Sequence, residues 1–293
     1  MNSYWYRHFM QRLFNIIAQT DSNTAKMAVP PDAFLDPASI ILCTAGLCVG
    51  IIWLFWFGGF GALRKAPVRR HRQRFVFWPL VILVFWIGGM LIVQTVTTTD
   101  IISYPANAIL EIGLIAGMLI IARKSFARGL KGFGLNGKYL ISNMPWAAIN
   151  LLGTFPLILS GLWVSLTLGR LFKGAGFSLE VHQTLDILTD AGVGLRILVI
   201  IFAAVIVPVF EELLFRGFFQ TSLRSLSGSP WVGIILTSVF FAILHPPTHI
   251  PALFFLSCGL GYAYERSGSL FRPILMHIFF NGLSIGMTLL AAQ

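Results

Sequence analysis

Charge is what this sequence has least of. Only 11% of its 293 residues are charged, against about 25% in an ordinary soluble protein, and 56% are hydrophobic. This balance excludes a globular protein in water. The three cysteines lie inside apolar stretches without paired spacing, which excludes a disulfide framework and a zinc knuckle. Acidic residues are scarcer than basic ones, 11 against 21.

Long apolar runs take the place of the missing charge. Each is about 20 residues long, enough to cross a hydrocarbon core of about 30 Å as a helix. We therefore predict an all-α protein, a polytopic transmembrane helical bundle with about eight spans. It would be an integral, multi-pass protein of the plasma or inner membrane if its source is bacterial. The expected spans are residues 38–62, 75–97, 102–122, 140–168, 197–223, 231–245, 251–264 and 273–293.

The basic residues gather in short connections between these runs. Residues 64–74 and 123–138 hold six and five Lys or Arg residues, respectively, and no acidic residue. The positive-inside rule places both connections in the cytoplasm. Counting spans from them puts the N-terminus outside and the turns near residues 228 and 268 inside. The net charge of +10 thus reflects membrane topology, and we expect no nucleic-acid partner.

The chain divides into three parts by composition. Residues 1–37 are interpreted as an N-terminal amphipathic helix and a linker, and residues 38–196 as accessory transmembrane spans with basic cytoplasmic loops. The third part, residues 197–293, carries the polar residues that the earlier spans lack. Among those earlier spans only a lone Glu111 stands out, and two interpretations of it remain open: pairing with another helix, or a protonated structural carboxyl group.

Three ionisable residues interrupt the apolar run of the fifth span. In hydrocarbon each costs roughly 2.5 to 3.5 kcal/mol on insertion scales, so such a cluster indicates a functional site. Glu212 and Arg216 are four residues apart on one helical face and can pair, whereas Glu211 points about 100° away. One carboxylate is thus neutralised locally, and Glu211 is left available.

Two later helices carry further polar residues. Phe241 and His245 are four apart, as are His277 and Asn281, so each pair shares a helical face. In a hairpin that turns near residue 228, Glu211 and His245 lie at equal distances from the turn and should face each other. His277 and Asn281 lie one to three helical turns from that depth, an offset that helix tilt can absorb.

This set of residues suits amide hydrolysis. A carboxylate and an imidazole can hold and deprotonate a water, and a second imidazole with an amide can donate to the oxyanion that follows. The sequence also allows zinc, because Glu211, His245 and His277 form a His₂Glu set, although it contains no HExxH motif. A different class of function also fits: a non-catalytic membrane scaffold or transporter that uses the buried Glu/Arg/His cluster as a proton or substrate site.

The three motifs, read together, resemble those of a known family. EExxxR at 211–216, FxxxH at 241–245 and HxxxN at 277–281 occur in the order found in the CPBP intramembrane proteases. This family includes CAAX prenyl endopeptidases and bacteriocin-processing or immunity proteins. The resemblance covers about residues 197–293, which we therefore interpret as a catalytic CPBP-type transmembrane core.

The resemblance implies roles for seven residues. Glu211 and His245 would activate the water, His277 and Asn281 would form the oxyanion hole, and Glu212, Arg216 and Phe241 would support them. It implies a peptidase, specifically an intramembrane endopeptidase that depends on glutamate and needs no cofactor, with zinc as the alternative. The expected partners are membrane lipids and a protein or peptide substrate, which in the eukaryotic members is lipid-modified.

Overall fold

The computed structural model describes residues 37–56, 59, 61, 63, 77–97, 100–174, 177 and 192–291. The predicted amphipathic helix and nearly all of its linker, and the basic connection 64–74, lie outside these residues. Within them the chain forms helices and no strand. The prediction of an all-α helical membrane bundle is confirmed.

Eight long helical segments follow one another in the described residues, close to the predicted ranges. The fifth is a continuous run of five shorter pieces, from α8 to α10. Three short helices lie in connections: α5 (Leu130–Phe133), η3 (Gly137–Tyr139) and η6 (Pro247–His249). The eight segments are α2 (Pro37–Trp56), α3 (Trp78–Val96), α4 (Asp100–Ser125), α6 (Leu140–Lys173), α8–α10 (Val193–Ser227), α11 (Pro230–Ile243), α12 (Ile250–Ser267) and α13 (Phe271–Ala291).

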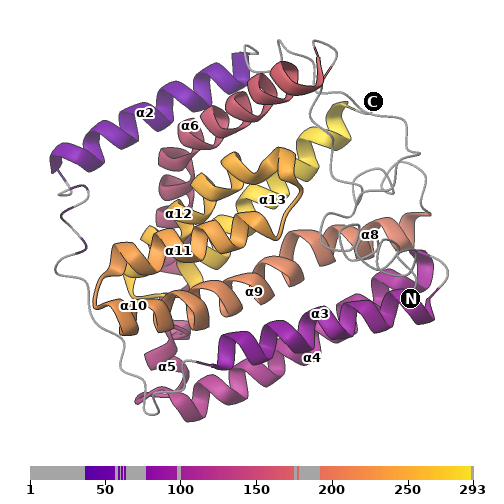
Figure 1. Ribbon diagram of the computed structural model, residues 1–293. Helices are drawn as coiled ribbons and strands as arrows, with labels where there is room; N and C mark the ends of the chain where they lie inside the picture. The colour runs from indigo at the N-terminus through magenta and orange to yellow at the C-terminus, as the bar shows by residue number, and fades with distance from the viewer. Residues whose placement is uncertain are drawn as a thin grey trace.

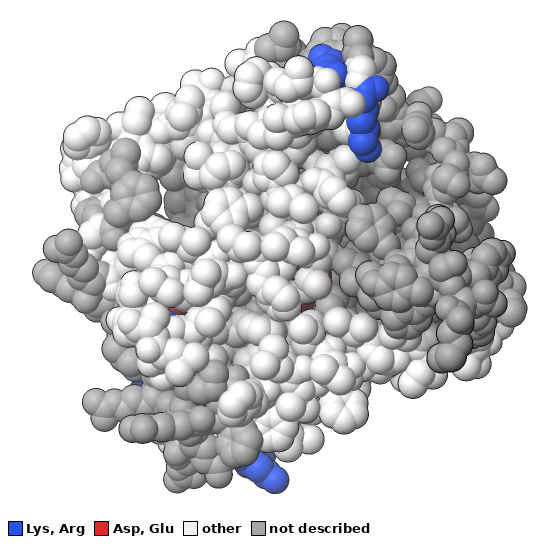
Figure 2. Space-filling view, viewed as in Figure 1, with Lys and Arg blue, Asp and Glu red and all other residues white. Residues whose placement is uncertain are grey.

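The outer surface of the bundle is apolar. Four helical stretches are long and apolar enough to cross a membrane by length and composition: Trp78–Val96, Ile102–Ser125, Gly137–Lys173 and Val193–Ser227. Large apolar side chains point outward, and Phe55 and Ile141 are 78% and 79% exposed. Figure 2 shows a face that is almost free of charge, with Lys and Arg side chains at its two ends. A hydrocarbon environment accounts for this pattern.

The helices pack in an order that places α12 at the centre. It contacts α6, α11 and α13, and α6 in turn packs against α2. Figure 1 shows α2 along α6 at one edge of the bundle and the pair α3 and α4 at the opposite edge. The α8–α10 run lies between the α3–α4 pair and the C-terminal helices.

The α8–α10 run departs from the regular α-helix that the sequence predicts. Two segments are π-helical, η4 (Phe202–Ile206) and η5 (Leu213–Gln220), and they flank α9 (Val207–Glu212). Pro208 has no backbone N–H with which to donate to the residue four positions earlier, and Val207 N donates five residues back to Phe202 O. Widened turns of this kind are frequent at functional sites.

Glycines close two of the later helices at the turns that the sequence predicts. Gly228 and Gly268 adopt φ angles of +69° and +68°, so each supplies the left-handed residue that closes a helix. One boundary differs from the prediction. The helix α11 ends at Ile243, so His245 lies in the bend after it. The residue before a proline disfavours helical geometry, and two prolines follow His245.

The close contact between α6 and α12 offers a test of this packing. A Cβ atom added at Gly161 would lie 2.6 Å from the backbone N and Cα of Ala252. Backbone cannot move aside as a flexible side chain can, so we expect Gly161→Ala to destabilise the protein by about 1–3 kcal/mol. The measurement is the thermal unfolding midpoint in detergent.

Gly117 in α4 serves as the control, because a Cβ added there has no neighbouring atom within 4 Å. Gly117→Ala should keep or raise the midpoint, since alanine favours a helix over glycine by up to about 1 kcal/mol. Equal effects of the two changes would contradict the close approach of α6 and α12.

Candidate active site

The two glutamates at the end of α9 are both buried and have different partners. Glu212 is fully buried, and Arg216 Nη1 donates to its Oε1 at 2.8 Å. Arg216, also fully buried, donates through Nη2 to Ser257 Oγ at 2.8 Å and to Ser257 O at 3.2 Å. The predicted pairing of Glu212 with Arg216 is confirmed. Through the contact of Arg216 with Ser257, the pair also joins the fifth span to α12.

Glu211 lies between two imidazoles. Its Oε1 is 3.8 Å from His245 Nε2, and its Oε2 is 3.6 Å from His277 Nε2. The structure thus brings Glu211 and His245 together as the hairpin argument predicts. His277, from α13, completes the set. Both distances exceed that of a direct hydrogen bond, and a water commonly bridges polar atoms at such a separation.

The second ring nitrogen of each histidine shows how the ring is oriented. His245 Nδ1 lies 2.8 Å from Phe241 O, and His277 Nδ1 lies 2.9 Å from Glu212 Oε1. A carbonyl oxygen and a carboxylate oxygen both accept, so each Nδ1 carries the hydrogen and donates. In a neutral ring the Nε2 atom that faces Glu211 is then an acceptor. This tautomer suits a group that takes a proton from water.

Phe241 packs against the charged residues and holds their positions. It is fully buried, and its ring centroid lies 4.6 Å from that of His245 and 6.1 Å from that of His277. The Arg216 guanidinium lies 5.0 Å from the same ring, a distance typical of a cation–π contact. A single aromatic side chain thus contacts three of the predicted site residues.

Asn281 lies one turn beyond His277 on α13 and contacts the π-helical segment η4. Its Nδ2 donates to Ala203 O at 2.9 Å. One amide hydrogen is therefore used to join α13 to the fifth span, and the second is left for another acceptor. The role that the resemblance assigns to Asn281 stays a prediction.

Two neighbours of the site, Ser257 and Gln220, could not be recognised from the sequence, whereas a third, Glu111, stands out there as a lone carboxyl group. Ser257 is a small polar residue in an apolar helix, a pattern too common to single out. Glu111 in α4 is buried and lies near the Trp86 indole and Glu211. Gln220 donates through Nε2 to Gly261 O at 3.0 Å and to Glu265 Oε1 at 3.1 Å. The last contact belongs to a second polar group, in which Arg224 also pairs with Glu265.

A metal site remains a prediction. In the part of the chain that the structure describes, no group of three or more His, Cys, Asp or Glu side chains is arranged so that it could hold a metal ion as it stands. The residues closest to such a group are Glu211, His245 and His277, the set that the sequence predicts. Their nitrogen and oxygen atoms face one another at 3.6 and 3.8 Å.

Comparison with known proteins assigns this part of the chain. Residues 193–283 match the family model described as type II CAAX prenyl endopeptidase Rce1-like. This segment is similar to that family. The match confirms the resemblance to the CPBP and CAAX proteases, and it contains every predicted site residue from Glu211 to Asn281. No curated protein and no solved structure matches the chain.

The Rce1-like match and the long apolar helices together make the chain an integral, multi-pass membrane protein. The match supports a CAAX-protease-like intramembrane endopeptidase, and with it a protein or peptide substrate. The match thus implies a peptidase, and the structure shows the matched segment as part of a helical bundle.

The buried pair of Glu212 and Arg216 generates a stability prediction. Arg216→Met leaves the Glu212 carboxylate buried without its cation, which should cost about 3–5 kcal/mol. The double change Glu212→Gln with Arg216→Met removes both charges and should cost clearly less than Arg216→Met alone. Thermal unfolding midpoints of the purified variants in detergent measure both effects.

Arg123, an exposed arginine in the last turn of α4, provides the matched control. Arg123→Met should change the free energy of unfolding by no more than about 0.5 kcal/mol, as surface changes usually do, and so leave the midpoint nearly unchanged. The single variant Glu212→Gln is measured as well. If the loss of stability in the double variant equals the sum of the losses in Arg216→Met and Glu212→Gln, the two charges are not coupled.

Proposed function

We propose that this protein is an intramembrane endopeptidase in which Glu211 and His245 activate a water molecule. One observation carries the proposal: within the Rce1-like segment, each carboxylate oxygen of Glu211 faces the Nε2 atom of a histidine, at 3.8 and 3.6 Å. A buried carboxylate held between two imidazoles has the arrangement that a general base requires.

The reaction follows from these positions. A water held between Glu211 and His245 Nε2 gives a proton to the Glu211 carboxylate while its oxygen forms a bond to the carbonyl carbon of the peptide. The carbonyl π electrons move to the oxygen and give a tetrahedral oxyanion. When the C–N bond breaks, Glu211 returns the proton to the departing amine nitrogen.

The oxyanion needs donors on the opposite side, and α13 supplies two candidates. Asn281 has a second amide hydrogen beyond the one given to Ala203. His277 donates from Nε2 only when its ring carries a proton on both nitrogens. The Glu212 carboxylate, whose Oε1 lies 2.9 Å from His277 Nδ1, would balance that positive charge. Such donors act strongly in a site that excludes water.

The substrate that we propose is a peptide next to a lipid-anchored cysteine. The Rce1-like match supports this choice, because the family description names CAAX prenyl endopeptidases. The apolar outer surface of the bundle would let the lipid group remain in hydrocarbon while the peptide reaches Glu211. His245, whose side chain is 23% exposed, is the more accessible of the two histidines.

Loss of either water-activating residue should remove activity. We expect Glu211→Gln and His245→Ala each to lower kcat for cleavage of a fluorogenic, prenylated peptide by at least about 10²-fold, the usual contribution of general acid–base catalysis. The assay uses the full chain in lipid nanodiscs, and thermal unfolding verifies that each variant is folded.

His249, four residues after His245 and bonded to Thr248 Oγ1, is the control histidine. His249→Ala should retain cleavage. If cleavage survives in both the Glu211→Gln and His245→Ala variants, the assignment as a peptidase by this mechanism fails, and the scaffold or transporter interpretation gains.

Metal removal separates the glutamate-dependent mechanism from the zinc alternative. We favour the first, so we expect a chelator to leave cleavage unchanged and metal analysis of active protein to show less than one equivalent of zinc. If one stoichiometric metal is lost together with activity, the ligands are assigned to Glu211, His245 and His277. Both ring Nε2 atoms face Glu211, and both Nδ1 atoms are held by an acceptor, as is usual for histidine ligands of metals.

A further inference from the structure

A second polar site lies at one end of the bundle, away from the glutamates. A cavity of about 330 Å³ opens where the connection between α4 and α6 meets the turn between α12 and α13. Two hydrogen bonds join these segments: Leu270 N donates to Gly134 O at 2.9 Å, and Tyr264 Oη donates to Phe133 O at 3.1 Å. The cavity walls are therefore fixed relative to each other.

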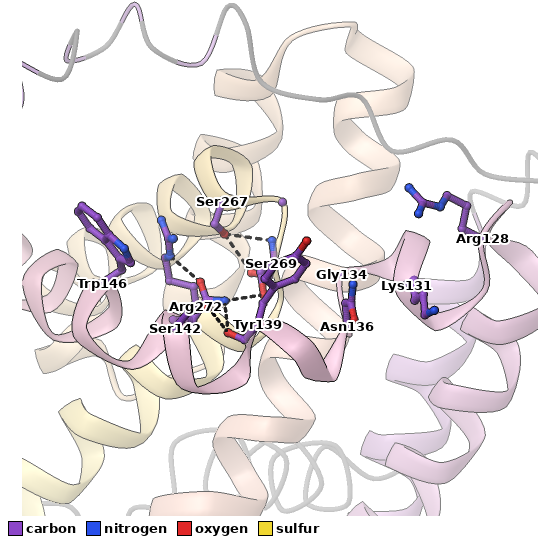
Figure 3. A pocket seen from close by; sticks show the side chains of 12 residues that line it. Arg128, Lys131, Gly134, Asn136, Tyr139, Ser142, Trp146, Ser267, Ser269 and Arg272 are labelled. Atoms are coloured by element: carbon purple, nitrogen blue, oxygen red, sulfur yellow. Dashed lines mark hydrogen bonds between the residues drawn. The ribbon is translucent and has the colours of Figure 1, made fainter.

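The cavity is strongly basic. Arg128 and Lys131 lie on one side and Arg272 on the other, as Figure 3 shows, and the lining contains no Asp or Glu. No ion pair joins any of the three cations to another described residue. Three positive side chains without a negative partner around one cavity indicate an anionic ligand.

Arg272 is held in place by a buried asparagine and an exposed tryptophan. Its Nε donates to Asn143 Oδ1 at 2.9 Å, and its guanidinium lies 5.7 Å from the Trp146 ring. Asn143 is 4% exposed and donates through Nδ2 to Ser269 Oγ at 3.3 Å. No described residue accepts from the two terminal nitrogens of Arg272. A merely solvated arginine would need no such support, whereas a ligand-binding arginine benefits from it.

The position of the cavity matches the depth of lipid headgroups. Tyr139 and Trp146, which belong to the lining, are 54% and 43% exposed at the start of the long apolar helix α6. Tyrosine and tryptophan concentrate at membrane interfaces. Basic pockets between transmembrane helices bind phosphate-bearing headgroups on the cytoplasmic side. The positive-inside rule predicts that side for both segments that form the cavity.

We propose that this cavity binds a phosphate group, carried by the headgroup of an anionic phospholipid or present as free phosphate. An arginine fork can contact two phosphate oxygens at once, and a lysine adds a point charge. At about 30 Å³ per water, the volume holds roughly ten waters, which is enough for a phosphate with a glycerol attached. This proposal for the basic cavity is independent of the peptidase activity proposed above.

Ligand-induced stabilisation tests the proposal in detergent solution. We expect short-chain phosphatidylglycerol to raise the thermal unfolding midpoint of the full chain in a saturable way, because a ligand that binds only the folded state stabilises it. Short-chain phosphatidylcholine should not. The titrations are run at 0.15 M salt, where a Debye length of about 8 Å limits unspecific attraction.

Matched charge changes locate the site. Arg128→Gln with Lys131→Gln should weaken binding of phosphatidylglycerol by at least about tenfold, as should Arg272→Gln. The control, Arg123→Gln with Lys124→Gln, removes the same charge from exposed residues of the same connection that do not line the cavity. Equal losses in the two double variants would overturn the proposal, since unspecific attraction to the basic surface would then explain the binding.

A titration with inorganic phosphate distinguishes a phospholipid headgroup from free phosphate as the ligand. If phosphate alone stabilises the parent protein, competes with phosphatidylglycerol and loses its effect in Arg272→Gln, the ligand is free phosphate. If only the lipid does so, the headgroup is the ligand. Absence of stabilisation by either compound, or equal stabilisation by phosphatidylcholine, would overturn the proposal.

Discussion

The site depends on one fully buried ion pair, that of Glu212 with Arg216. A charge in an apolar interior persists only when a partner compensates it, and Glu212 has two partners on different helices. Arg216 extends the contact to Ser257 on α12, and His277 extends it to α13. The same pair thus fixes both the packing of three helices and the orientation of the His277 ring. The position of His277 Nε2 beside Glu211 is a consequence of that orientation.

The π-helical turns of the fifth span provide backbone carbonyl groups to which side chains of the site can donate. Widened turns leave backbone carbonyl groups outside the regular pattern, and side chains reach two of them: Asn281 donates to Ala203 O, and Thr221 Oγ1 donates to Arg216 O at 3.0 Å. The first of these contacts fixes α13 one turn beyond His277. Irregular backbone on one helix is therefore satisfied by the helix that carries the other half of the site.

Local features of the fold could be predicted from the sequence, whereas helix rotation could not. The turns at Gly228 and Gly268, the pairing of Glu212 with Arg216, and the meeting of Glu211 with His245 all follow from spacing along the chain. The contact of His277 with Glu212 depends on how α13 is rotated and tilted. Its sequence, like those of the other spans, is apolar on most sides, so no hydrophobic face indicates that rotation. The contacts of His277 with Glu212 and of Asn281 with Ala203 O hold that rotation instead.

Topology and ligand binding meet in the basic connection between α4 and α6. The charge pattern predicts that residues 123–138 and the turn near residue 268 lie on the same side of the membrane, and the bond from Leu270 N to Gly134 O joins these two segments directly. The chain must then cross the membrane an even number of times between Gly134 and Leu270. Basic residues from which the positive-inside rule predicts the side of this connection also line the cavity that we propose for phosphate, so a single local excess of positive charge would serve both purposes.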